Sequence, residues 1–261
     1  MQYKYLIHPL KEIIYQAGQR ILEASKNFDK SKIIHKNTYD LVSYVDIETE
    51  RFLIEELSKL FPDAGFIAEE SHLQSNKDWN WIIDPLDGTT NFTRQLPSYA
   101  ISVALAHKTE ILIGVVYNIP LNEMFWAVKN NGAFLNDKTI KVSNNDFSNS
   151  LFVTGFSVSR FDKVEIHLNV VKQIITQTLG IRRLGAAAVD LCYVACGRLD
   201  GFFEWYLNPW DVAAGSLIAI EAGALVSDFS GQNNYLFGKE IVSAQPKVYQ
   251  QLLQMIQNST I

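Results

Sequence analysis

The sequence of 261 residues contains only two cysteines, Cys192 and Cys196, so it carries no disulfide framework. The two lie four residues apart in an apolar, alanine-rich stretch, which favours a place in the core of a helix. No histidine or further cysteine lies near them to complete a four-ligand zinc site, and we set a zinc function aside. Few cysteines are typical of proteins in a reducing cytoplasm, which is the location we expect.

Long hydrophobic runs and an excess of basic residues are also missing. No stretch reaches the roughly 18 apolar residues that a membrane span needs, and residues 1–8 lack the pattern of a secretory signal. The 23 Lys and Arg residues are outnumbered by 28 Asp and Glu, which gives a net charge of −5. This balance argues against a protein that binds a nucleic-acid backbone. The composition indicates neither a membrane nor a nucleic acid as partner.

The remaining sequence, 48% hydrophobic, is typical of a globular α/β protein. Hydrophobic periodicity predicts a helix over residues 9–26 and another over 47–60, the latter with Asp46 as N-cap. Short strands are expected between residues 66 and 135. A polar patch over residues 143–150 is the best internal boundary. After it strands and helices alternate, with strands at 151–154 and 201–204 and helices at 163–179, 186–196, 212–222 and 246–257.

The most informative segment covers residues 81–92, where an apolar strand ends in two acids. Asp84 and Asp87 stand three residues apart, and Pro85 should stop the strand at Asp84. Two carboxylates so close cannot both be buried as anions without a positive charge between them. A hard dication with oxygen ligands meets this need, and the carbonyl of Leu86 can add a third oxygen. Two solvated aspartates in an ordinary turn are the alternative.

The same segment continues into a predicted phosphate site. Gly88 permits a tight approach of the backbone, and Thr89 and Thr90 can open a helical turn. Free N–H groups at such a helix start bind phosphate.

Three other segments carry acids of the same kind. Glu69 follows the apolar residues 66–68, Asp211 precedes an apolar helix, and Asp40 and Asp46 flank a strand-like stretch. Each has an ordinary alternative: Glu69 can be a surface residue, Asp211 can be an N-cap, and the last two can cap or turn.

Together, residues 40–46, 68–71, 84–92 and 210–215 resemble the four ordered signatures of the inositol monophosphatase family, within the lithium-sensitive sugar-phosphatase superfamily. The resemblance covers nearly the whole chain; Ala68 departs from it, because glycine is more usual there. It implies a layered α-β-α-β-α sandwich and a homodimer. We divide the chain into an N-terminal α+β lobe (residues 1–145), which carries most metal ligands, and a C-terminal α/β lobe (146–261). Together they should form one compact unit.

The resemblance also implies roles for single residues. The predicted ligands of two or three Mg²⁺ ions are Glu69, Asp84, the carbonyl of Leu86, Asp87 and Asp211. Glu69 and Thr89 would orient and deprotonate a water for direct hydrolysis, with Asp46 supporting Thr89. The predicted substrate-binding residues are Asp87, Gly88, Thr89, Gly185, Ala186, Ala187, Glu204 and Asp211.

Some positions stay open at this stage. Glu204 can also be an exposed acid at a strand end. Lys36 matches a family lysine near the site, but a surface lysine is an equal reading. For Arg182 and Arg183 we favour a structural or subunit-contact role, because the ions already neutralise the phosphate.

The predicted reaction is the Mg²⁺-dependent hydrolysis of a small polyol or sugar monophosphate, with inositol 1-phosphate as the best candidate. Fructose 1,6-bisphosphate and 3′-phosphoadenosine 5′-phosphate are alternative substrates within the superfamily. Thr90 and Asn91 favour the polyol branch, since the nucleotide-type relatives usually have Lys and Glu there. A non-catalytic regulatory protein on the same fold is the alternative from another class.

Overall fold

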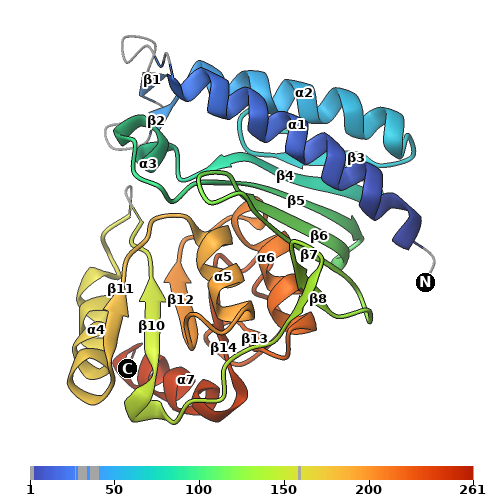
Figure 1. Ribbon diagram of the computed structural model, residues 1–261. Helices are drawn as coiled ribbons and strands as arrows, with labels where there is room; N and C mark the ends of the chain where they lie inside the picture. The colour runs from blue at the N-terminus through green and yellow to red at the C-terminus, as the bar shows by residue number, and fades with distance from the viewer. Residues whose placement is uncertain (1–2, 27, 29–33, 36–40, 158–159, 261) are drawn as a thin grey trace.

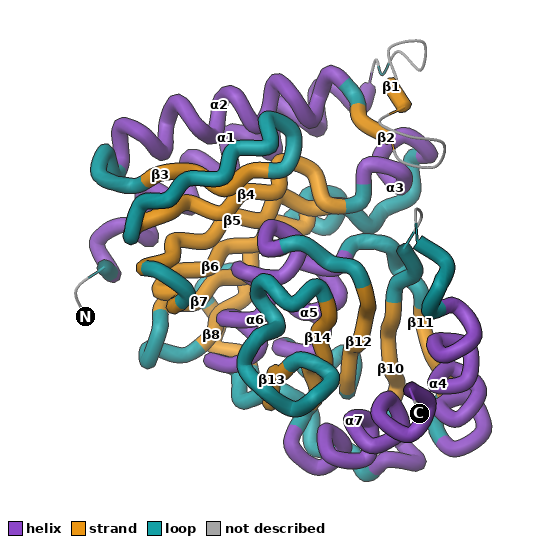
Figure 2. Tube along the Cα trace, turned by 180° about the vertical axis from the view of Figure 1, so that it is seen from behind, coloured by secondary structure: helices purple, strands orange, loops and turns teal. Residues whose placement is uncertain are grey.

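The computed structural model describes residues 3–26, 28, 34, 35, 41–157 and 160–260. Five layers follow one another (Figures 1 and 2): helices α1 (Ile7–Lys26) and α2 (Tyr44–Leu60), a large sheet, helices α5 (Ala187–Ala195) and α6 (Pro209–Glu221), a smaller sheet, and helices α4 (Val164–Gln177) and α7 (Pro246–Thr260). This order confirms the predicted α/β sandwich. The division into lobes near residue 145 stays a prediction.

The large sheet has seven strands in chain order. They are β3 (Gly65–Ala68), β4 (Trp79–Asp87), β5 (Ala100–His107), β6 (Glu110–Asn118), β7 (Glu123–Val128), β8 (Ala133–Leu135) and β9 (Lys138–Ile140). Only β3 and β4 are parallel, so both strands deliver their C-terminal acids to the same edge of the sheet. Helix α3 (Thr89–Arg94) follows β4 directly.

The smaller sheet has the order β11 (Gly180–Arg182), β10 (Leu151–Thr154), β12 (Gly201–Trp205), β14 (Glu240–Ala244) and β13 (Leu225–Ser227). Strand β10 runs parallel to both β11 and β12, and the remaining pairs are antiparallel. A third, two-stranded sheet pairs β1 (Ile34–His35) with β2 (Leu41–Val42). Short 3₁₀ turns cover Lys4–Leu6 and Phe147–Asn149.

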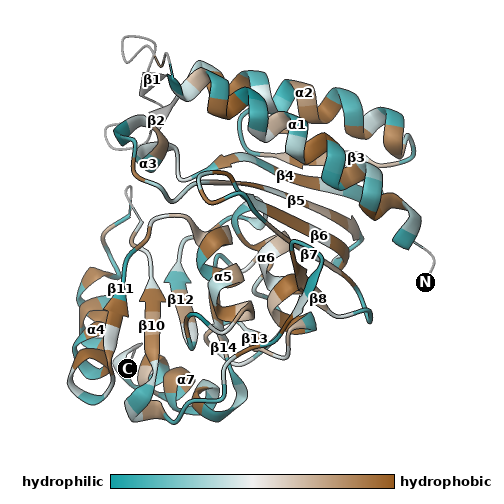
Figure 3. Ribbon diagram, viewed as in Figure 1, coloured by the Kyte–Doolittle hydropathy of each residue, from teal (hydrophilic) through white to brown (hydrophobic). Residues whose placement is uncertain are grey.

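Burial explains why the helices differ in composition. Helix α1 buries one stripe, including Leu10, Ile14, Ala17 and Ile21, at the spacing of a helix that covers a sheet. Helices α5 and α6 lie between two sheets and are apolar on nearly every side. Figure 3 shows the contrast, with α1 and α2 striped and the strands of the large sheet mainly hydrophobic.

Two predicted helix caps are wrong. Ser43, not Asp46, is the N-cap of α2, and Asp46 in the first turn accepts the Ser43 N–H in a capping box. Asn208 caps α6 in the same way, with Asp211 in its first turn. In both helices one carboxylate oxygen of the acid accepts the N–H of the N-cap residue, and the other oxygen can bind a different partner.

Strand β4 also corrects an expectation, because it does not stop at Asp84. It continues through Pro85 to Asp87, with a shift in its register against β5 between the two acids. A proline lacks the N–H that a regular ladder needs, and an irregularity accommodates it. Of the sequence-predicted positions, Lys36 and Asp40 lie outside the described residues. No described helix is long and apolar enough to cross a membrane.

Candidate active site

One pocket of about 260 Å³ collects acids from separate elements of the chain. It is lined by Glu69, Asp84, Leu86, Asp87, Gly88, Thr89, Thr90, Arg183, Gly185 and Asp211. All five predicted metal ligands are among them. They come from the end of β3, the end of β4 and the first turn of α6, so the sheet edge and the helix start bring them together.

Backbone N–H groups hold one oxygen of three of these carboxylates. Leu86 N donates to Asp84 Oδ1 at 2.9 Å. Ala188 N, in the first turn of α5, donates to Asp87 Oδ2 at 2.7 Å. The Asn208 N–H donates to Asp211 Oδ2 at 2.6 Å. Each acid is thereby oriented, and its second oxygen is available as a ligand.

The pocket is electrostatically costly for its own acids. Burial raises the pKa of Asp84 and of Asp211 well above the usual range, and the charge of Glu69 adds to both shifts. Burial raises the pKa of Asp87 to about 7, against the hydrogen bond from the backbone of Ala188. A cation among these groups would remove the cost, because it favours their charged forms.

The chemistry of the donors fits a hard dication. Carboxylate and carbonyl oxygens are the ligands of Mg²⁺ and Ca²⁺. Within the described part of the chain, no three Asp, Glu, His or Cys side chains lie close enough together to bind one metal ion as they stand. The ligand set therefore stays a prediction, consistent with the donor types.

Thr89 is tied to α2. Its hydroxyl lies 2.8 Å from Asp46 Oδ1 and 3.1 Å from the carbonyl oxygen of Leu86. Asp46 is fully buried, and its other oxygen accepts from the N–H and the hydroxyl of Ser43, at 2.9 and 2.5 Å. Burial raises the pKa of Asp46, and the hydrogen bonds from Ser43 and Thr89 oppose that rise. The predicted pairing of these two residues is present.

The start of α3 is built on a left-handed glycine. Gly88 has φ +90° and precedes the first helical residue, Thr89. A Cβ at this position would lie 2.8 Å from the Ser98 carbonyl oxygen, so both conformation and space require glycine. Asn91 then donates to the Ser98 and Leu184 carbonyls at 2.7 and 2.8 Å, which ties α3 to the loop before α5.

The predicted polyol positions lie around this pocket, though only Gly185 lines it. Ala186 and Ala187 are buried beside it at the start of α5. Glu204, on β12, is 8% exposed, so the alternative of an exposed strand-end acid is wrong. Burial raises its pKa to about 8, opposed by the charge of Arg183. The binding roles themselves stay predictions.

The sequence as a whole agrees with this geometry, since a profile of the inositol monophosphatase family matches residues 3–260. The chain belongs to that family. SuhB of Neisseria meningitidis serogroup B is 44% identical over 244 residues, which cover 92% of this chain and 94% of the relative. The Nus factor SuhB of Pasteurella multocida is 40% identical over 245 residues, with 93% and 92% covered.

Solved structures agree as well. The extragenic suppressor protein SuhB of Bartonella henselae is 33% identical, with a TM-score of 0.92 and 97% and 99% of the two chains covered. The IMPase of Thermotoga maritima is also 33% identical, with a TM-score of 0.86 and 95% of each chain covered. The family assignment from the four sequence segments is confirmed.

Arg183 was not expected in the active site of this inositol monophosphatase family member. It lines the pocket, while Arg182 bonds the carbonyl of its neighbour Ile181. The guanidinium of Arg183 lies against Gly185, where a Cβ would come within 2.1 Å of Nη1. Gly185 has φ +88°, a backbone conformation that favours glycine. The sequence did offer one indication of this place, because Arg183 stands only two residues before Gly185, a predicted substrate-binding residue.

Asp190 is a second residue that sequence reasoning did not find. It is buried in α5, and neither carboxylate oxygen has a hydrogen-bond partner among the described residues. Burial raises its pKa well above the usual range, and the charges of Glu204 and Asp87 add to the shift. An acid in the middle of an apolar helix was the sequence signal.

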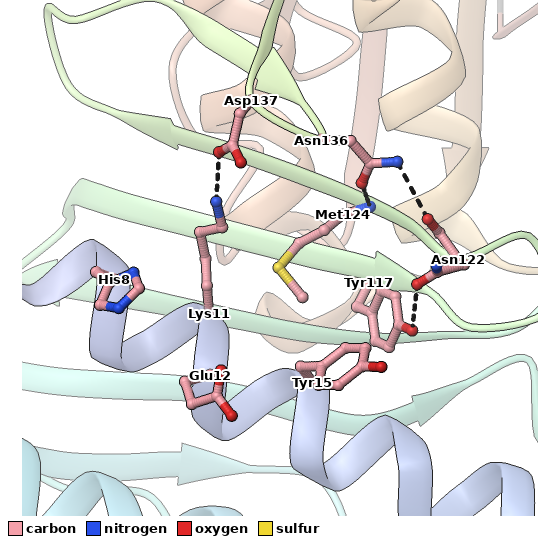
Figure 4. Close-up of a pocket in the computed structure, with 9 residues that line it drawn as sticks. All are labelled: His8, Lys11, Glu12, Tyr15, Tyr117, Asn122, Met124, Asn136 and Asp137. Atoms are coloured by element: carbon pink, nitrogen blue, oxygen red, sulfur yellow. Dashed lines mark hydrogen bonds and ion pairs between the residues drawn. The ribbon is translucent and has the colours of Figure 1, made fainter.

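A separate cavity of about 310 Å³ lies between α1 and the strands β6 and β7, away from the family motifs (Figure 4). Lys11 pairs with Asp137 at 2.5 Å, and Tyr117 donates to Asn122 at 2.8 Å. These two bonds join side chains of the cavity wall to one another.

Proposed function

We propose that the protein hydrolyses the phosphate monoester of a small polyol or sugar with Mg²⁺, and that inositol 1-phosphate is its best substrate. One observation carries the proposal. Four acids, the Leu86 carbonyl and the Thr89–Asp46 pair meet at a single pocket in a chain of the inositol monophosphatase family.

We assign each residue of the pocket a role in the proposed reaction. When bound, Mg²⁺ supplies positive charge to the phosphate oxygens and lowers the pKa of a water. Glu69, Asp84, Asp87 and Asp211 would hold the ions together with the Leu86 carbonyl. Thr89 and Glu69 would orient the attacking water. Buried Glu204 would accept a hydrogen bond from a polyol hydroxyl, because a carboxylate removed from water needs such a partner.

The decisive experiment measures phosphate release from a panel of substrates with Mg²⁺. Inositol 1-phosphate, 2-glycerophosphate, fructose 1,6-bisphosphate and 3′-phosphoadenosine 5′-phosphate separate the alternatives. We expect the highest kcat/KM for inositol 1-phosphate and no turnover after chelation. Turnover that survives exhaustive chelation would overturn the metal requirement, and a preference for the nucleotide would overturn the polyol assignment.

The same assay tests the choice of ion. Ca²⁺ should compete without supporting turnover, since it prefers longer bonds and looser geometry than Mg²⁺. Li⁺ should inhibit at millimolar levels by occupying a position among the same carboxylates, as the family resemblance implies. A LiCl titration that coincides with a NaCl control would count against this.

A second function is favoured by the names of the relatives, since several carry the name Nus factor. A role of this kind need not depend on turnover. The acidic charge balance does not by itself exclude a macromolecular partner. Complementation of a strain lacking its own SuhB, with wild type and with Asp87→Asn, separates the two functions: rescue by the inactive variant would show a role independent of hydrolysis. The homodimer and the cytoplasmic location remain proposals, the first to be tested by light scattering.

A further inference from the structure

Helix α2 presents two buried acids one turn apart. Asp46 and Glu50 are separated by four residues, which places them on one face of the helix. Asp46 is 0% exposed and Glu50 is 3% exposed. Asp46 bonds Thr89, as described above. Glu50 bonds the two residues that follow Glu69, a residue of the pocket.

The carboxylate of Glu50 accepts two backbone N–H groups from the loop after β3. Glu70 N donates to Oε2 at 2.7 Å, and Ser71 N donates to Oε1 at 2.8 Å. These are the two residues directly after Glu69. Both oxygens are used, one for each N–H, so the carboxylate fixes the orientation of the loop as well as its distance from α2.

The loop itself is a short excursion from the sheet. It leaves β3 at Ala68 and returns where Ala68 N bonds the carbonyl of Leu73, with a bridge between Ile67 and Gln74. His72 adopts a left-handed conformation with φ +52°. Between these anchors the Glu50 carboxylate accepts the N–H groups of residues 70 and 71.

We propose that Glu50 is a positioning residue that holds Glu69 at the metal site, and that α2 sets the spacing between Glu69 and Thr89 through Glu50 and Asp46. The two groups that would orient the attacking water are thus fixed to the same helix, one turn apart. Helix α2 is itself held by buried Phe52, Leu53 and Leu57. The inference rests on the role of Glu69 as a metal ligand, which is part of the proposed function.

Glu221 offers a matched control. Its carboxylate also accepts backbone N–H groups from a loop, at 2.7 Å from Asn130, 3.0 Å from Asn131 and 2.8 Å from Gly132. That loop connects β7 to β8 and is not part of the acidic pocket. Glu50→Gln and Glu221→Gln therefore remove the same kind of interaction, one beside the metal site and one remote from it.

The experiment compares Mg²⁺ binding by calorimetry in the wild type, Glu50→Gln, Glu221→Gln, Glu69→Gln and the double variant Glu50→Gln/Glu69→Gln. A glutamine turns an NH₂ group toward one loop N–H, so the loop loses at least one bond. Glu50→Gln should weaken Mg²⁺ binding about 10- to 100-fold, the usual effect of losing a residue that orients a ligand. Glu221→Gln should change it less than about twofold, because it touches no ligand. In the Glu69→Gln background the Glu50 change should add little, since Glu50 acts through Glu69.

Hydrogen exchange at the amides of residues 70 and 71 provides an independent check that the loop is released. Glu50→Asp is a second variant, to be used if Glu50→Gln does not fold. Glu50→Asp keeps the charge but shortens the reach, so it should weaken Mg²⁺ binding too. The proposal would be overturned by a folded Glu50 variant whose amides at residues 70 and 71 exchange faster than in the wild type but whose Mg²⁺ affinity is unchanged. Additive losses in the double variant would also overturn it. A wild type that binds Mg²⁺ but releases no phosphate would instead refute the proposed function and leave the role of Glu50 intact.

Discussion

The hydroxyl of Thr89 lies 2.8 Å from Asp46 Oδ1, although the two residues are 43 positions apart in the chain. The second oxygen of Asp46 is already engaged by the N–H and the hydroxyl of Ser43, so Oδ1 is the oxygen available to Thr89. A threonine hydroxyl has a single hydrogen. When that hydrogen is given to Asp46, the Thr89 oxygen can only accept, which orients a neighbouring water with one proton toward Thr89.

This arrangement predicts that Thr89→Val strongly reduces turnover. Valine keeps the shape of threonine but cannot accept the water proton or bond Asp46, and loss of such a group typically costs 10²- to 10⁴-fold in rate. Thr89→Ser should keep most of kcat. Thr93→Val is the control, since Thr93 is a buried threonine of the same helix that bonds the Thr90 carbonyl. Equal kcat losses in Thr89→Val and Thr93→Val would mean that the hydroxyl supports only the fold of α3.

A second prediction concerns Asp87→Asn. The change removes a charge that the ion needs, so kcat should fall well below a tenth of the wild-type value. A fall of only tenfold corresponds to ~1.4 kcal/mol of barrier, and a smaller one would contradict the assignment. Above about pH 8 the metal-free variant should unfold at a higher temperature than the wild type, because asparagine replaces a buried carboxyl that is ionised above its pKa of about 7. Asp190→Asn is the matched control: its carboxyl is also buried but lies outside the predicted ligand set, so this variant should keep its turnover.

The sequence was sufficient to predict that the acids of the pocket lie together, because they occur at strand ends and helix starts that are themselves predictable. Asp84 and Asp87 lie in the last part of β4 and Asp211 lies in the first turn of α6, and four ordered segments identified the family. The hydrogen bond between Asp87 and the N–H of Ala188 joins residues 101 positions apart, and no local sequence pattern predicts such a contact. Glu50 escaped notice for the same reason, since its partners lie 20 and 21 residues away and offer only backbone N–H groups.

Helix caps and the strand end were predicted less well. Asp46 and Asp211 looked like N-caps, but Ser43 and Asn208 hold those positions, because an acid three residues after a cap completes a capping box. The conformational preference of proline, taken alone, also predicts that the strand ends before Pro85. The irregular register of β4 against β5 permits the proline, and that register is decided by tertiary packing.

The third prediction is a pH dependence of stability that originates in Glu204. Its pKa in the folded protein is about 8, above the ordinary value of 4.5. The folded state therefore binds the proton more tightly than the unfolded state, and this contribution to stability is lost as pH rises from about 4.5 through about 8. In EDTA, the Tm of the wild type should fall between pH 5.5 and 8.5. The fall should be smaller in Glu204→Gln by at least ~3 °C, because glutamine does not titrate. The same fall in both proteins would contradict the buried state of this acid.

The last prediction tests whether the same carboxylate selects the substrate. If Glu204 accepts a hydrogen bond from a polyol hydroxyl, Glu204→Ala should raise KM for inositol 1-phosphate much more than for the shorter 2-glycerophosphate. Above about pH 8 Glu204 is ionised, and a hydrogen bond to this charged acceptor contributes roughly 1.5–3 kcal/mol, so the expected loss in that pH range is ~10- to 150-fold. Part of this binding can be expressed only in the transition state, and kcat would then fall as well.

Mg²⁺ affinity provides the control, and it should not change, because Glu204 is outside the predicted ligand set. Equal losses on both substrates would show that Glu204 acts through the fold or through the ions. Unchanged kinetics on both would show that the polyol does not reach β12. A loss confined to inositol 1-phosphate is the result that ties the buried acid of β12 to substrate recognition, because the inositol ring carries hydroxyls farther from the phosphate than those of 2-glycerophosphate.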